Sequence, residues 1–202
     1  MFAGLDLACA EIVPVRLPPP QTRESMTSYA LRVAAGLGLR PEDWLGGVSF
    51  GSLVAGEIAR RRPVRGLILI GGALSAASFV RSIRWFGLIA RVVPVTRIKT
   101  LLATPAALRF VFGSLPVSRM RLLRDMMIAT PAALLREGMR LATDYRPAIP
   151  VLCPAHAIHG ACDRLMRPPP VTNCRVVPNA GHRLAVTHQN EVAEFLRGLV
   201  CS

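Results

Sequence analysis

The sequence has few aromatic residues and no apolar run long enough to cross a membrane. Aromatic side chains make up 5% of its 202 residues, so Leu, Val, Ile and Ala must fill the core, and hydrophobic residues as a whole reach 51%. The longest apolar run, residues 66–80, is shorter than the roughly 20 residues of a membrane-spanning helix. A buried strand with its exit turn is the better interpretation. The composition therefore favours a globular domain over a transmembrane protein.

Signals for metals, nucleotide cofactors and secretion are also missing. The five cysteines form no CxxC pair, so we expect neither a zinc site nor a disulfide framework, and we interpret them as reduced thiols of a cytoplasmic protein. No histidine or carboxylate cluster has metal-ligand spacing, and no GxGxxG or GxxxxGK[ST] motif lies between a strand and a helix. The N-terminus has no basic segment followed by an apolar one, so no secretory signal is expected.

Lysine is nearly absent, although the chain is strongly basic. The formal net charge is +13, and Lys99 is the one lysine among 25 basic residues. Residues 81–146 carry a net charge of +9 and the remainder +4, so the basic character is regional. A solvated arginine face, an acidic protein partner and an anionic membrane surface are all compatible with this pattern. Nucleic acid is the least favoured partner, because no recognition motif or aromatic stacking platform accompanies the charge.

The apolar pattern alternates short strands with helices. We expect strands at 11–17, 44–48, 64–70, 150–159 and 174–177, and helices at 24–37, 52–61 and 191–199. The region between the third and fourth strands is predicted to form several helices. Its hexapeptide ATPAAL occurs at 103–108 and 129–134, each time with Thr as N-cap and Pro at the first helical position.

The expected fold class is therefore α/β, with a mostly parallel sheet flanked by helices. We assign residues 1–80 and 150–202 to this core and residues 81–149 to a helical cap insertion.

A G-x-S-x-G pentapeptide, GVSFG, places Ser49 between an apolar run and a helical one. A nucleophile in such a strand-to-helix turn has a strained backbone, which requires small residues at the Gly47 and Gly51 positions. The helix N-terminus directs its N–H groups at charge that develops near the serine. We therefore predict Ser49 as a nucleophile; the simpler interpretation is a tight turn that needs its glycines.

A serine hydroxyl needs a base near neutral pH, and the chain offers four histidines. His182 lies in a turn after the 174–177 strand and is the predicted base. His156 and His159 lie within or at the end of a strand and are interpreted as packing or supporting residues. His188 borders the last helix and is interpreted as a surface residue.

A carboxylate must hold the imidazole of the base in one tautomer. Asp163 follows the 150–159 strand and is the predicted acid, whereas Glu191 and Glu194 belong to the closing helix. The alternatives are a turn aspartate bonded to its own backbone and, for His182, an ordinary loop histidine. The chain order is Ser49, Asp163, His182, which is the nucleophile–acid–base order of one hydrolase fold.

Four segments together carry a resemblance to a known family. They are GVSFG with its helix, VRGLILIGGAL, PVLCPAHAIHGACDRLM and CRVVPNAGHRLAVTHQNEVAEFL, which cover most of residues 44–80 and 150–199. In these segments the chain resembles the α/β-hydrolase superfamily, specifically small bacterial esterase- and lipase-like hydrolases with a helical cap. The front of the fold is shorter than in that family.

The resemblance implies a mechanism for a carboxylic ester or thioester. Ser49 attacks the carbonyl, His182 takes its proton, Asp163 orients His182, and water releases the acyl group. The backbone N–H groups of Phe50 and Leu5 are the oxyanion donors that the resemblance implies. No cofactor is implied.

Several alternatives stay open at this point. The chain could be a weak or inactive relative that acts as a binding protein, or an acyltransferase that uses the same three residues. The basic cap could dock an acidic carrier protein, as in the carrier-protein methyl esterase of biotin synthesis, or an anionic membrane through arginines interleaved with apolar residues. The cap aromatics Trp85, Phe86, Phe110 and Phe112 could line an apolar acyl pocket or could simply pack the cap helices on the domain; both interpretations stay open.

Overall fold

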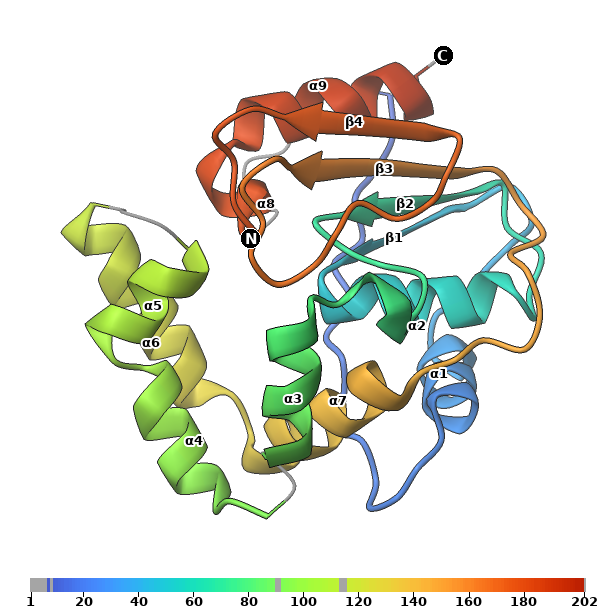
Figure 1. Ribbon diagram of the computed structural model, residues 1–202. Helices are drawn as coiled ribbons and strands as arrows, with labels where there is room; N and C mark the ends of the chain where they lie inside the picture. Colours follow the sequence, from blue (N-terminus) through green and yellow to red (C-terminus); the bar gives the residue numbers. More distant parts are fainter. Residues whose placement is uncertain (1–6, 8, 90–91, 113–115, 202) are drawn as a thin grey trace.

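In the described part of the chain, four parallel strands form the centre of the fold (Figure 1). The structure is a computed structural model and describes residues 7, 9–89, 92–112 and 116–201. The strands follow one another across the sheet in chain order, β1(Trp44–Val48), β2(Gly66–Ile70), β3(Ala155–Gly160) and β4(Asn173–Val177). All four arrowheads point to the same side, so the loops that leave the strands gather at one edge of the sheet.

The register between the strands aligns their carboxyl ends. Val48 pairs with Ile70, and Ile70 pairs with Ile158 in the next strand. Gly160 and Val177 pair at the end of β3 and β4. A residue that directly follows any of these strands therefore begins at this edge.

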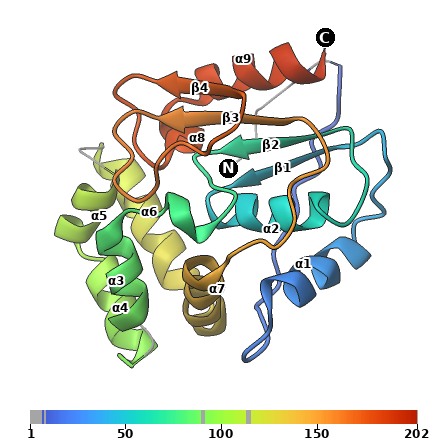
Figure 2. The same cartoon turned by 45° about the vertical axis from the view of Figure 1, so that its right-hand side comes forward.

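Helices cover both faces of the sheet, as two views show (Figures 1 and 2). The helices α1(Met26–Ala35) and α2(Phe50–Ala59) lie on one side, and α8(Leu184–Thr187) and α9(Gln189–Val200) lie on the other. Strand β2 is buried over its whole length because Leu67 and Leu69 pack toward α2, whereas Ile68 and Ile70 pack toward α9. This explains its continuous apolar sequence.

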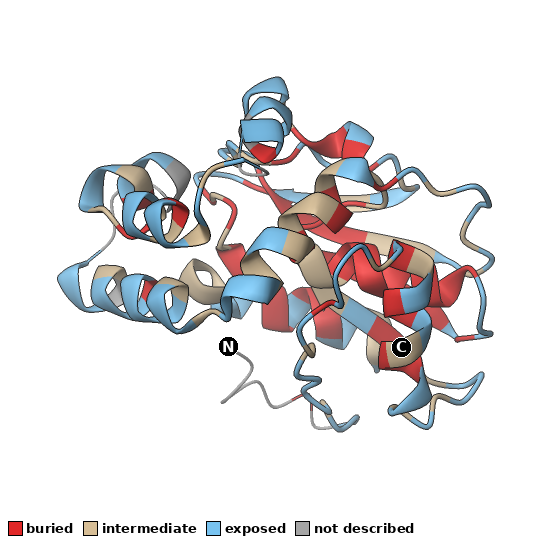
Figure 3. Ribbon diagram, turned by 90° about the horizontal axis from the view of Figure 1, so that it is seen from below, coloured by how far each residue is buried: buried red, intermediate tan, exposed pale blue. Residues whose placement is uncertain are grey.

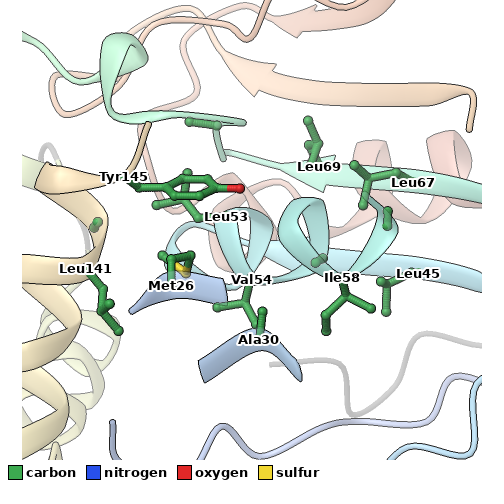
Figure 4. Packing of buried hydrophobic residues seen from close by; sticks show 14 of the residues in the cluster. Met26, Ala30, Leu45, Leu53, Val54, Ile58, Leu67, Leu69, Leu141 and Tyr145 are labelled. Carbon is green, nitrogen blue, oxygen red and sulfur yellow. The ribbon is translucent and has the colours of Figure 1, made fainter. Parts of the chain in front are cut away.

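The larger core cluster lies between β2 and the two helices α1 and α2 (Figure 4). Leu53 and Ile58 of α2 are fully buried there, together with Ala30 of α1. Helix α2 begins one residue after Ser49, so this packing also holds the start of the helix against the sheet.

Between β2 and β3, the described part of the chain forms a short 3₁₀ turn, η1(Ala76–Ser78), followed by five α-helices. They are α3(Arg81–Ile89), α4(Val95–Leu102), α5(Pro105–Phe112), α6(Val117–Ala129) and α7(Ala132–Asp144). Helix α7 contacts α2, whereas α4, α5 and α6 lie together away from the sheet and present mostly exposed and half-buried residues (Figure 3). No helix in the described ranges is long and apolar enough to span a bilayer.

The α/β class and the parallel sheet are confirmed, but two local expectations are wrong. Residues 11–17 form no strand, since Pro14 interrupts the run and Val13 and Val15 are exposed rather than packed on a sheet. Thr104 does cap α5, accepting from the Ala107 N–H at 3.3 Å. The equivalent Thr130 instead donates to the Met126 carbonyl at the end of α6, at 2.8 Å.

The expectation of reduced cysteines is wrong for one pair. Cys9 and Cys201 form a disulfide with their Cα atoms 5.7 Å apart, although 192 residues separate them in the sequence. This bond joins the N-terminal segment to the end of α9. The other three cysteines, Cys153, Cys162 and Cys174, are free.

A buried carboxylate joins α1, α2 and the end of α7. Glu57 accepts hydrogen bonds from Thr27 Oγ1 and Tyr145 OH, both at 2.5 Å, and from Arg61 Nε at 2.9 Å. Burial alone would raise the pKa of Glu57, but these hydrogen bonds outweigh burial and hold it below its usual range. The carboxylate therefore remains ionised and links three helices.

The hydrogen bond from Tyr145 to this carboxylate predicts a measurable loss of stability in Tyr145→Phe. We expect the free energy of unfolding to fall by about 1.5–3 kcal/mol, the range for a hydrogen bond to a charged group. Tyr29→Phe is the matched control, because the Tyr29 hydroxyl donates to the neutral Pro18 carbonyl at 2.7 Å. Its loss is expected to be about 0.5–1.5 kcal/mol. Urea denaturation measures both; equal losses would contradict the prediction.

Candidate active site

Ser49 occupies a strained turn between β1 and α2. Its backbone has φ of 52°, a left-handed conformation that is uncommon for a residue other than glycine. Its N–H donates to the Ile70 carbonyl at 3.2 Å, which ties the turn to the end of β2. This geometry directs the Ser49 side chain out of the turn at the carboxyl edge of the sheet.

The two glycines of the pentapeptide have different roles. A Cβ on Gly47 would collide with the backbone of Gly51 and Ser52, so residue 47 must be glycine for the turn to close. No described atom outside the local helix backbone lies within 4 Å of a Cβ on Gly51. The expectation that both positions need a small residue is therefore supported for Gly47 and not for Gly51.

His182 lies in the loop after β4 and reaches the Ser49 hydroxyl. Its Nε2 is 2.7 Å from Ser49 Oγ, and the side chain is 4% exposed. Two glycines let this loop approach the sheet. A Cβ on Gly71, after β2, would lie 2.9 Å from the His182 carbonyl oxygen, and one on Gly160 would lie 2.6 Å from the Gly181 carbonyl oxygen.

Asp163 follows β3 and holds the other nitrogen of His182. Its Oδ2 is 2.8 Å from His182 Nδ1, and its Oδ1 accepts the backbone N–H groups of Leu165 at 2.8 Å and Met166 at 3.1 Å. Burial would raise the pKa of Asp163, but hydrogen bonds from His159 and His182 outweigh it and hold the pKa well below the usual range. The carboxyl is therefore ionised in the folded protein.

The segment after β2 supports the loop that carries Asp163. Val80 N–H donates to the Leu165 carbonyl at 3.1 Å, and Arg167 N–H donates to the Ser78 carbonyl at 2.8 Å. Phe79 and Met166 form an antiparallel bridge between these two bonds. The backbone that directly follows Asp163, from Leu165 to Arg167, is therefore held by the segment after β2. We call residues 160–167 the acid loop.

The other histidines lie around this group in different ways. His159, at the end of β3, is fully buried with Nε2 3.2 Å from Asp163 Oδ2. His156 packs on the Trp44 ring and its Nδ1 is 3.0 Å from Asn173 Nδ2, and His188 is bonded to its neighbour Thr187. Of these three histidines, only His159 contacts Asp163. The sequence feature that could have identified it is its position directly before Gly160, which begins the loop to Asp163.

One of the two expected oxyanion donors can be described. Phe50 is the first residue of α2, and no described residue accepts a hydrogen bond from its backbone N–H. Its ring packs beside Tyr29, with ring centroids 6.0 Å apart, so the N-terminal turn of α2 is fixed. Leu5, the second expected donor, lies outside the described residues.

An acyl pocket among the cap aromatics is not supported by the residues that can be described. The Trp85 side chain is 64% exposed, and Phe110 is 57% exposed with the Arg164 guanidinium 5.5 Å from its ring centre. The side chains of Phe86 and Phe112 lie outside the described part. A cavity of about 270 Å³ lies elsewhere, between α1, α2 and α7, where Glu57 and Tyr145 line it.

Within the described ranges, no group of three or more His, Cys, Asp or Glu side chains could hold a metal ion. The site itself presents a hydroxyl, an imidazole, a carboxylate and the N-terminus of α2.

Comparison with solved structures identifies the class of fold. No protein-family model matches the sequence, and no curated protein matches it. Solved structures do match, among them esterases and thioesterases of the α/β-hydrolase type. The chain therefore has the α/β-hydrolase fold, as the sequence motifs predicted.

Three of the similar structures are a thioesterase, an esterase and MenH. The RedJ thioesterase from the prodiginine biosynthetic pathway in Streptomyces coelicolor is 22% identical, with 98% of this chain and 84% of that chain covered and a TM-score of 0.67. MenH from S. aureus is 15% identical (90% and 80% covered, TM-score 0.66). A thermophilic esterase from Thermogutta terrifontis is 20% identical (87% and 71% covered, TM-score 0.63).

The different surroundings of Gly47 and Gly51 predict opposite results for two alanine substitutions. Gly47→Ala opens the turn at Ser49 and is expected to lower the free energy of unfolding by about 1–3 kcal/mol, the cost of forcing an extra methyl group into a packed site. Gly51→Ala adds a good helix former and is expected to raise stability by up to about 1 kcal/mol. Thermal and urea denaturation measure both. A Gly51→Ala variant as unstable as Gly47→Ala would contradict the assignment.

Proposed function

We propose that this protein is a serine hydrolase that cleaves a carboxylic ester or thioester. The observation that carries the proposal is the unbroken hydrogen-bond chain from Ser49 Oγ through His182 to Asp163, with distances of 2.7 Å and 2.8 Å. The α/β-hydrolase fold and the order of the three residues along the chain support it.

In the proposed reaction, Ser49 Oγ attacks the carbonyl carbon while His182 Nε2 accepts the hydroxyl proton. The negative oxygen of the tetrahedral intermediate faces the N-terminus of α2, where the Phe50 N–H donates to it. His182 then returns the proton to the leaving alcohol or thiol, and an acyl ester remains on Ser49. Water gives its proton to His182, attacks this ester and releases the acid, and Ser49 regains its proton.

Asp163 stays ionised throughout this cycle. Its role is to hold the Nδ1–H of His182 and to stabilise the imidazolium that forms in each half-reaction. The lowered pKa of Asp163 supports this role, because the carboxyl remains charged wherever His182 can act as a base.

A fluorophosphonate probe tests whether Ser49 is activated. We expect one covalent adduct on the wild-type chain and none on Ser49→Ala, because the probe reacts with a serine whose proton is taken by a neighbouring base. Asp163→Asn is expected to slow labelling by about 10⁴-fold, since the amide favours the wrong tautomer of His182. Intact-mass analysis over time measures both rates.

A thermal melt of each variant shows whether the chain is folded. A folded wild-type protein without an adduct would overturn the hydrolase proposal and favour a binding protein with the same fold. If the adduct forms, product analysis with added alcohol or amine acceptors separates a hydrolase from an acyltransferase, which uses the same three residues.

The α3–α7 segment, within residues 81–149, is the proposed cap of the hydrolase core formed by 1–80 and 150–202. One link between the two is Arg164, the residue after Asp163, whose Nη1 donates to the Phe110 carbonyl of α5 at 3.2 Å. A second is Arg140 of α7, whose Nη2 donates to the Glu24 carbonyl at 2.5 Å. Within the cap, Lys99 of α4 donates to the carbonyls of Ile128 and Thr130 and so joins α4 to the end of α6.

The basic charge of the cap favours a second, narrower substrate: an acyl thioester on an acidic carrier protein. Residues 81–146 carry a net charge of +9, and arginines such as Arg97, Arg121 and Arg124 are exposed. Opposite charge accelerates association and orients the partner. Two similar structures, RedJ and ClbQ from the colibactin NRPS/PKS pathway, are described by biosynthetic pathways, which agrees with this choice.

Charge reversal on α6 tests the carrier proposal. Arg121→Glu with Arg124→Glu is expected to lower kcat/KM for an acyl carrier protein by more than tenfold at low salt, because steering contributes 10- to 1000-fold. Activity on a small ester is expected to be unchanged. Arg16→Glu with Arg62→Glu, at exposed positions outside the cap, is the matched control. Unchanged carrier kinetics with lost binding to anionic vesicles would indicate a membrane surface instead.

The cytoplasmic location expected from the sequence stays a prediction. The Cys9–Cys201 disulfide argues against it, because disulfides persist in oxidising compartments and are rare in the cytosol.

A further inference from the structure

We infer that His159 is a positioning residue that locks the Asp163 carboxylate in the orientation His182 requires. This inference rests on the proposed hydrolase function. It concerns a histidine that the sequence patterns assigned to packing or support and that does not contact Ser49. Its imidazole lies at the end of β3, four residues before Asp163, and is fully buried.

Two imidazoles share one oxygen of Asp163. His182 Nδ1 is 2.8 Å from Oδ2 and His159 Nε2 is 3.2 Å from the same atom. The other oxygen, Oδ1, accepts two backbone N–H groups, from Leu165 and Met166. The Asp163 carboxylate therefore has four N–H groups within 3.2 Å, two facing each oxygen. Rotation of the carboxyl group would break bonds on both oxygens, so the Asp163–His182 bond has one favoured geometry.

The surroundings of His159 define which of its nitrogens carries the proton. Nε2 has two acceptors within reach, Asp163 Oδ2 at 3.2 Å and the Met166 carbonyl oxygen at 3.1 Å. Nδ1 is buried and has no hydrogen-bond partner among the described residues. The proton therefore lies on Nε2, since a proton on Nδ1 would be buried without an acceptor. This single N–H is shared between the Met166 carbonyl oxygen, with which it makes a hydrogen bond, and Asp163 Oδ2 beside it.

The unpaired Nδ1 shows that packing alone does not account for a histidine here. A buried polar atom without a partner destabilises the folded state, and such atoms are rare in native proteins. A phenylalanine would fill a similar space without that cost. The gain that offsets it comes from the Nε2–H, which faces both the Met166 carbonyl and Asp163 Oδ2 and which a phenylalanine cannot supply.

Two substitutions at residue 159 separate positioning from packing. His159→Phe keeps a ring of similar size and removes the donor, whereas His159→Gln offers an amide N–H near the position of Nε2. We expect His159→Phe to lower kcat for an ester by about 10- to 100-fold with KM unchanged, the effect of misplacing a group at the site. His159→Gln is expected to restore most of kcat. His156→Phe, three residues earlier in β3, is the control and is expected to leave kcat unchanged.

A second readout does not depend on activity. The proton between His182 and Asp163 is expected to give a far-downfield NMR resonance, assigned by its loss in His182→Gln. We expect it to be lost or moved in His159→Phe and kept in His159→Gln. If the wild-type chain fails to react with a fluorophosphonate, the hydrolase proposal falls, yet this signal still tests His159. Wild-type kcat and an unmoved resonance in a folded His159→Phe, or equal losses in the Phe and Gln variants, would overturn the inference.

Discussion

The hydrogen bonds between the four parallel strands align the strand ends, and every residue of the candidate site depends on that alignment. Ser49 follows β1, the Asp163 loop follows β3 and the His182 loop follows β4. These side chains come from positions up to 133 residues apart, yet they lie within hydrogen-bonding distance. A slip of one residue in any strand pair would displace its loop by about 3.3 Å, more than a hydrogen bond tolerates.

Two buried carboxylates hold separate parts of this structure: Asp163 holds the site, and Glu57 holds helix α2. Asp163 joins the loops after β3 and β4 at the carboxyl edge, and Glu57 joins α1, α2 and the end of α7 two turns along α2 from Ser49. A buried charge is costly unless it is fully paired, so each carboxylate also selects one arrangement of its neighbours. The N-terminus of α2 is held by the Ser49 turn against the sheet, and its last turn is held through Glu57 by α1 and the end of α7.

The α3–α7 segment differs from the buried core of the sheet and α2 in its charge and in its exposed apolar side chains. Most of the net positive charge lies on it, and large apolar side chains such as Trp85 and Val92 are exposed on it. It contacts the core through α7 and through the Arg164–Phe110 pair beside the acid loop. The same fold hosts many reactions because substrate recognition is carried by such insertions, whereas the strand ends carry the chemistry. Any specificity of this protein is therefore expected to reside in this segment.

The sequence by itself determined the features that depend on near neighbours: the buried strands with their apolar runs, the Ser49 turn with Gly47, and the helical nature of residues 81–149. Chain order also pointed to Asp163 and His182. Only the tertiary structure decided that His159 joins Asp163, that Gly51 is not required sterically, that Cys9 meets Cys201 and that residues 11–17 form no strand. Backbone propensity acts within a few residues, whereas a shared carboxylate, a disulfide or a strand partner requires groups that only folding brings together.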